Sequence, residues 1–152
     1  MIRIIGIGSP FGGDAVGLRA AEILAADPPS NCEVVSADRP GAELIELMDG
    51  ADAVILIDAV RSGAPPGTIH VLEFDELEGA SARFVSSHDL GVAAAIQLAR
   101  KLDRAPSRGW IVGLEIAPDE LNKIEQFDCG SDTAIDELVA RVRSCAKALY
   151  HR

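Results

Sequence analysis

One run of five apolar residues, Ala53–Ile57, restricts the fold of this chain more than any other feature. A strand that is buried on one face alternates apolar and polar residues, whereas a run that is apolar throughout needs cover on both faces. Such strands are typical of parallel sheets that lie between two layers of helices. The run continues into Asp58, so we expect a carboxylate at the carboxyl end of a central strand.

The rest of the chain alternates between short apolar runs and stretches with helical spacing. We expect further strands at Ile2–Ile7, Cys32–Ala37, Thr68–Phe74 and Trp110–Leu114, and helices from Val16 to Leu24, over Ala42–Met48, from Ser86 or Ser87 onward, and from about Asp132 to Leu149. This order predicts a three-layer α/β/α sandwich with a mostly parallel, twisted sheet. The strand at Thr68–Phe74 follows its predecessor too closely for a helical crossover, so it is expected to be antiparallel or at an edge. Without repeats or linkers, residues 1–152 are expected to form a single domain.

Composition narrows the classes of function. The 152 residues include 14 basic and 24 acidic side chains, a net charge of −10. This charge argues against nucleic-acid binding and against docking on anionic lipid. No apolar run approaches the roughly 20 residues of a membrane span, and the first residues lack the order of a signal peptide. The three cysteines, Cys32, Cys129 and Cys145, form no CxxC pair, so we expect a cytoplasmic protein without a thiolate metal site.

Acidic side chains follow most of the expected strands. In open parallel sheets, ligands bind beyond the carboxyl ends of the strands. The carboxylates expected at that edge are Asp14, Asp38, Asp58 and Glu115, and His88 stands at the start of a helix. Residues that are distant in sequence can therefore converge on one site, with Asp38 at its rim.

Three of these residues, Asp14, Asp58 and His88, offer two carboxylates and one imidazole. Such a set suits a borderline divalent ion such as nickel, zinc or iron, with coordination positions left for a substrate. Each residue also has a plainer alternative. Asp14 could cap the following helix, Asp58 could tie down the next loop, and His88 could bond to Asp89.

The glycines Gly6, Gly8 and Gly12 suggest a different function. A glycine-rich loop after a strand, with Asp38 at the end of the next strand, resembles a dinucleotide-binding fingerprint. However, Asp14 near the helix start would compete with a pyrophosphate for the positive end of the helix dipole. Pro10 also removes one backbone donor from the loop. A nucleotide-binding domain of the Rossmann type therefore stays an alternative.

Four blocks of the sequence also carry a family resemblance. They are Gly6–Gly17, Leu56–Thr68, His88–Gly91 and Gly113–Glu115, in this order over nearly the whole chain. The chain resembles the hydrogenase maturation endopeptidases, which trim the large subunit of nickel–iron hydrogenases. Within the first block, Ser9, Gly13 and Ala15 depart from the usual asparagine, acid and glycine of that family, while the acid at Asp14 is present.

The resemblance implies an α/β/α fold of the phosphorylase/hydrolase-like type and a metal site formed by Asp14, Asp58 and His88. It further implies that nickel arrives on the precursor of the hydrogenase large subunit and is not kept by the enzyme. Cleavage then removes a short carboxyl-terminal extension of that precursor. The expected partner is this precursor, with no obligate small-molecule cofactor.

Two mechanisms stay open for Asp14 and Asp58 as catalytic residues. The metal could polarise the scissile carbonyl or activate a water molecule, or one aspartate could act as a general base in the manner of an aspartic protease. No G-x-S-x-G elbow supports an acyl-enzyme route. Asp38 and Glu115 are expected to bind the substrate, and the plainer alternative for Glu115 is that it caps a loop. A maturation chaperone that senses the metal without cutting is a further alternative.

Overall fold

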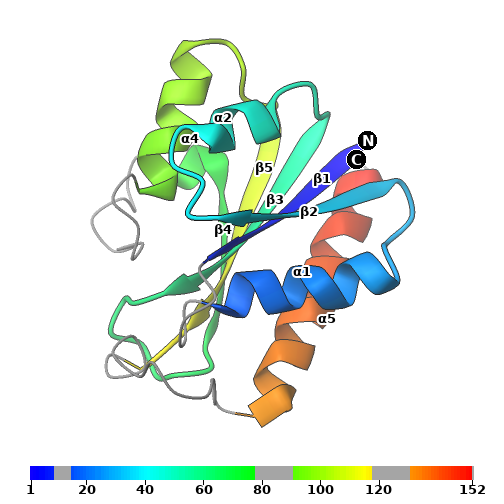
Figure 1. Ribbon diagram of the computed structural model, residues 1–152, viewed down its shortest axis with the longest axis vertical. Coiled ribbons are helices and arrows are strands. Elements are labelled where there is room, and N and C mark those ends of the chain that lie inside the picture. Colours follow the sequence, from blue (N-terminus) through cyan, green and yellow to red (C-terminus); the bar gives the residue numbers. More distant parts are fainter. Residues whose placement is uncertain (9–14, 78–90, 118–130, 152) are drawn as a thin grey trace.

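The computed structural model describes residues 1–8, 15–77, 91–117 and 131–151. In this part of the chain, five strands form one sheet in the order β2-β1-β3-β5-β4 (Figure 1). β1, β2, β3 and β5 are parallel, and β4 pairs antiparallel with β5 at one edge. The bounds are Ile2–Gly8 for β1, Cys32–Asp38 for β2, Ala53–Val60 for β3, Ile69–Glu73 for β4 and Arg108–Glu115 for β5.

Helices cover both faces of the sheet. They are α1 (Val16–Ala26), α2 (Glu43–Met48), α4 (Val92–Lys101) and α5 (Ser131–Tyr150), with a short 3₁₀ helix, η2, at Phe74–Glu76. α1 and α5 pack together on one face, and α2 and α4 lie on the other (Figure 1). The predicted α/β/α sandwich is therefore confirmed. Within the described residues, no helix combines the length and the apolar character that crossing a membrane requires.

The central strand β3 is buried at all eight of its positions. Ala53, Ile55 and Ile57 belong to the core beneath α1 and α5, whereas Val54 and Leu56 belong to the core beneath α2 and α4. Cover on both faces is what the uninterrupted apolar run predicts. Because side chains alternate along a strand, Asp58 belongs to the face that carries α2 and α4.

Some boundaries differ from the expected ones. β3 continues to Val60, so Asp58 lies inside the strand and not directly after it. In the described part of the chain, α4 begins at Val92, after Gly91 with extended backbone angles (φ −55°, ψ 142°), so the expected helix start at Ser86 or Ser87 is not tested. Ser86 and Ser87 themselves lie outside the described residues. The strand expected at Thr68–Phe74 is antiparallel and also at an edge, as predicted.

Candidate active site

The strand order places a topological switch point between β1 and β3. From β1 the chain moves to β2 on one side of β1, and later to β3 on its other side. The connections that follow β1 and β3 therefore lead away in opposite directions, and open α/β sheets usually bind their ligand in a crevice at the carboxyl ends of two such strands. Asp58 lies on β3 near this switch point.

Two carboxylates are buried close to the switch point. Asp58 and Glu115 are each only 3% exposed, and they are the only buried charged or polar residues among those that the structure describes. Asp58 stands opposite Gly113, and Val60 stands opposite Glu115, so both carboxylates share one sheet face. The strand spacing and rise place their Cα atoms about 8 Å apart. Burying a carboxylate costs free energy unless it is paired or hydrogen-bonded, so this concentration marks a specialised region.

The orientation of Asp58 is fixed in part by its own backbone. The register of β1 on β3 ends at the pair Gly6 and Ile57. Just beyond it, the N–H of Ala59 donates to Oδ1 of Asp58 at 2.8 Å. The bond gives a buried amide an acceptor and holds the carboxylate at the carboxyl end of the sheet.

Glu115 binds the connection between β3 and β4. Its Oε1 accepts the N–H of Ser62 at 2.8 Å, and its Oε2 accepts the hydroxyl of Ser62 at 3.0 Å. Oε2 also lies 3.1 Å from Nε2 of His70. The backbone of Glu115 bonds to Thr68 and Gly67 at 2.8 and 2.9 Å. The carboxylate is thus engaged by the protein itself, as in the loop-capping alternative.

Asp38 occupies the rim, as expected. It is the last residue of β2, stands opposite Gly8 of β1, and is exposed. Its Oδ1 accepts a bond from Nε of Arg39 at 3.1 Å. Two strand spacings, about 10 Å, separate β2 from β3. Contact of Asp38 and Glu115 with a substrate stays a prediction.

Asp14 and His88 lie outside the described residues, so the meeting of Asp14, Asp58 and His88 stays a prediction as well. The described residues that flank them lie at the carboxyl edge. Ala15, next to Asp14, occupies the N-cap position of α1, which follows β1. α4 runs antiparallel to β5, so its first residues, next to Gly91, also lie at this edge (Figure 1). Within the described part of the chain, no group of three or more His, Cys, Asp or Glu side chains is arranged to hold a metal ion.

A close approach of backbones fixes the start of α1. A Cβ atom at Gly17 would lie 2.1 Å from the carbonyl oxygen of Ile7 and 2.5 Å from that of Ile57. A Cβ at Gly6 would lie 2.3 Å from the carbonyl oxygen of Gly17. Only glycine permits this contact, which seats the first turn of α1 directly on β1 and β3, one residue before Asp58.

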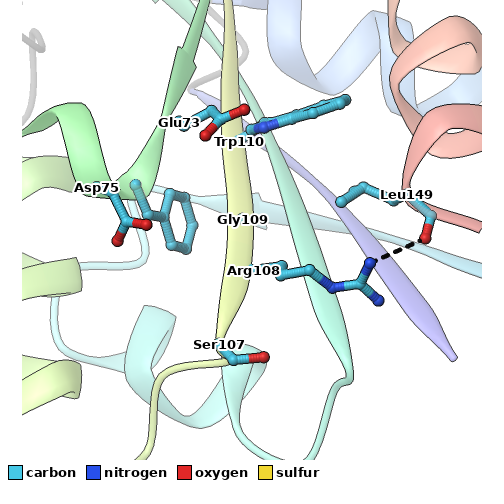
Figure 2. A pocket seen from close by; sticks show the side chains of 8 residues that line it. Glu73, Asp75, Ser107, Arg108, Gly109, Trp110 and Leu149 are labelled. Atoms are coloured by element: carbon cyan, nitrogen blue, oxygen red, sulfur yellow. Dashed lines mark hydrogen bonds between the residues drawn. The ribbon is translucent and has the colours of Figure 1, made fainter. Parts of the chain in front are cut away.

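A small pocket lies at the opposite end of β5. It has a volume of about 60 Å³ and is lined by Glu73, Phe74, Asp75, Ser107, Arg108, Gly109, Trp110 and Leu149 (Figure 2). The guanidinium of Arg108 donates to the carbonyl of Leu149 at 3.2 Å, which ties β5 to the end of α5 (Figure 2). The pocket has room for a few water molecules only and contains none of the predicted site residues.

Burial keeps Cys145 unreactive. It raises the pKa of the Cys145 thiol to about 11 and also raises the pKa of the Cys32 thiol. Both therefore stay protonated at neutral pH, and a protonated thiol is a poor nucleophile and metal ligand. Cys129 lies outside the described residues.

Ser62 and His70 were not among the candidate site residues. His70 reads in the sequence as a structural or exposed histidine in a strand. Its relation to Glu115 follows from the antiparallel register of β4 on β5, which places His70 opposite Gly113. The alternation of side chains along β4 and β5 is compatible with His70 and Glu115 on the same sheet face. Only the register between the two strands shows that these residues are neighbours.

The chain is similar in sequence to proteins of hydrogenase maturation. The family model described as hydrogenase maturation protease matches residues 18–142. The hydrogenase expression/formation protein HupD of Thiocapsa roseopersicina is 31% identical over 80% of this chain, and the chain spans 56% of its length. The hydrogenase 2 maturation protease of Escherichia coli is 26% identical over 93% of this chain and 90% of its own.

The fold leads to the same group. The hydrogenase maturating endopeptidase HybD of E. coli superimposes with a TM-score of 0.80 at 25% identity, covering 97% of this chain and 92% of its own. The Rossmann-type alternative has no such support from these matches. With 125 of its 152 residues matched by the family model, this chain belongs to the hydrogenase maturation protease family.

Proposed function

We propose that this protein is an endopeptidase that removes the carboxyl-terminal extension of a nickel–iron hydrogenase large-subunit precursor after nickel has been inserted. The observation that carries the proposal is the buried carboxylate of Asp58 at the switch point of the sheet, in a chain that belongs to a family of maturation proteases. A buried aspartate in a crevice between strand ends can meet a metal ion or an attacking water with little competition from bulk solvent.

The nickel of the precursor is part of the substrate in this proposal. Asp14, Asp58 and His88 bind it, which both confirms that the precursor is loaded and holds the scissile peptide in the crevice. Carboxylate oxygens and an imidazole nitrogen are suitable donors for nickel, and three protein donors leave positions for the precursor's own ligands. In support, Ala15 and Gly91, which flank the segments holding Asp14 and His88, lie at the same sheet edge as Asp58.

Two routes to peptide cleavage are compatible with Asp58. In the first, the metal polarises the carbonyl or lowers the pKa of a bound water, so the rate depends on which divalent ion the precursor carries. In the second, Asp14 or Asp58 removes a proton from the attacking water, so the dependence of the rate on pH is the same for different ions. Precursors loaded with nickel or zinc therefore distinguish the routes.

Asp38 fits a role in binding the extension of the precursor. It is exposed at the end of β2, two strands from Asp58, and is held by Arg39. A peptide that lies across the carboxyl ends of β3, β1 and β2 would pass Asp38 after leaving Asp58.

The test is incubation of the purified protein with nickel-loaded and with nickel-free precursor, followed by measurement of the intact mass. We expect the loaded precursor to lose the mass of its extension and the nickel-free precursor to keep it. A stable complex with the loaded precursor at unchanged mass would instead show a chaperone that senses the metal. Cleavage of both precursors at one rate would contradict nickel-dependent recognition.

A further inference from the structure

The buried carboxylate of Glu115 has no role in the mechanism above. All of its side-chain hydrogen bonds that the structure describes go to residues 61–70, which comprise the connection between β3 and β4 (residues 61–68) and the first two residues of β4. The β3–β4 connection, residues 61–68, begins three residues after Asp58. Glu115 therefore acts on the part of the chain that directly follows the candidate catalytic residue.

Glu115 binds both ends of the β3–β4 connection. Its side chain binds the backbone N–H and the hydroxyl of Ser62 near the start, and it reaches His70 in β4, just past the end. Its backbone bonds to Gly67 and Thr68. The start of the connection would lose both of these bonds to Ser62 without the carboxylate. A single buried group thus closes the loop and fixes where β3 ends.

Burying a carboxyl group costs free energy that a purely structural link between two strands would not need to spend. A carboxyl side chain that is 3% exposed loses most of its hydration, which its hydrogen bonds must offset. On the face that Glu115 shares with Asp58, the side chain of Val60 packs over Gly113, where a Cβ would lie 2.2 Å from Cγ2 of Val60. Asp58, Gly113 and His70 stand in one row across β3, β5 and β4. A change at Glu115 therefore reaches Asp58 through directly neighbouring positions.

We propose that Glu115 is a positioning residue that holds the β3–β4 connection through Ser62 and His70 and thereby orients the carboxylate of Asp58. Its effect on catalysis rests on the proposed endopeptidase function, but its effect on the geometry at Asp58 does not. Glu115 acts through its hydrogen bonds, so glutamine, which has the same shape and can exchange donor and acceptor roles with Ser62 and His70, replaces it well.

The first test uses the backbone amide of Ala59, which donates to Asp58 and so reports its orientation. We expect Glu115→Ala and Ser62→Ala to shift the ¹H–¹⁵N signal of Ala59 and to speed its hydrogen exchange about 10-fold or more, while Glu115→Gln restores the wild-type values. Glu43→Ala, at an exposed glutamate on α2, is the control and leaves the signal in place. An unchanged Ala59 signal in both alanine variants would overturn the proposal, and Ser62→Ala decides if Glu115→Ala does not fold.

The second test uses the nickel-loaded precursor. Misplacing a reacting group by about 1 Å costs up to 100-fold in rate, so Glu115→Ala is expected to lower kcat by 10- to 100-fold with KM unchanged. Glu115→Gln keeps most of the activity. A rise in KM with kcat unchanged would show direct substrate contact and refute the positioning role. If the wild-type protein cleaves no precursor, the endopeptidase proposal fails, and the Ala59 signal still decides the role of Glu115.

Discussion

The contact between α1 and the sheet predicts a large effect for Gly17→Ala. The new Cβ would lie 2.1 Å from the carbonyl oxygen of Ile7 and 2.5 Å from that of Ile57. Both are backbone atoms of central strands, so neither can rotate away. Relief requires that the first turn of α1 moves outward by about 1 Å, because a Cβ atom essentially never lies closer than 3.0 Å to another heavy atom.

The cost of this movement follows from what α1 buries. Val16, Ala20 and Leu24 are fully buried against the sheet and α5, so the displacement opens gaps along the helix. Overpacking costs about 1–3 kcal/mol, and alanine regains at most about 1 kcal/mol through its higher helix propensity. Because backbone atoms lie on both sides of the new Cβ, we expect the free energy of unfolding to fall by about 2 kcal/mol. This lowers Tm by about 4–8 °C in a protein of this size.

Urea unfolding monitored by circular dichroism measures this loss. Gly91→Ala is the matched control, because a Cβ there has no neighbour within 4 Å and the backbone φ is −55°. Only a helix-cap preference changes in the control, so its unfolding free energy should fall by less than about 1 kcal/mol. If Gly17→Ala is as stable as the wild type, the close seating of α1 on β1 and β3 is refuted.

Three further predictions concern the core and the site. The pKa of Cys145 is raised from its ordinary value near 9 to about 11. As the pH rises, the unfolded state therefore loses the thiol proton first, and the free energy of unfolding should fall between pH 9 and 11. Urea titrations should show this loss, up to about 2–3 kcal/mol, in the wild type and not in Cys145→Ala. Gly113→Ala forces only the side chain of Val60 to move, so we expect a loss of stability of about 1 kcal/mol by thermal unfolding. Because Gly113 lies opposite Asp58, the same variant should cleave the precursor clearly more slowly than the wild type. Unchanged cleavage would contradict the placement of the site. Leu56→Ala, in the fully buried centre of β3, should cost about 2–5 kcal/mol in urea unfolding, and a loss below 1 kcal/mol would contradict the two-sided cover of this strand.

The layered fold could be predicted because local patterns determine it. A strand such as Ala53–Ile57 can satisfy its apolar side chains only between two helix layers, and the short link to the strand near Thr68 excludes a crossover. The start of α4 was harder to predict from the sequence. The helix start expected at Ser86 or Ser87 rested on capping preference and lies outside the described residues, whereas α4 itself begins at Val92 after the extended backbone of Gly91.

The site was predictable only where a residue's place on a strand decides its role. Asp58 follows an apolar run, so its burial and its position at the carboxyl end could be inferred. The partners of Glu115 could not, because Ser62 and His70 reach it through the register of β4 and β5, and a register depends on tertiary packing. The same holds for the seat of Gly17 on β1 and β3, which requires the position of α1.

The most direct test of the central claim is the intact mass of nickel-loaded precursor after incubation with Asp58→Asn. Asparagine keeps an oxygen that can accept the N–H of Ala59, so the variant should stay folded while losing the carboxylate. Asp136→Asn, at an exposed position on α5, is the matched control. We predict that the control trims the precursor at the wild-type rate and that Asp58→Asn is slower by at least about 100-fold. Trimming by Asp58→Asn at the wild-type rate would remove Asp58 from the reaction and contradict the account.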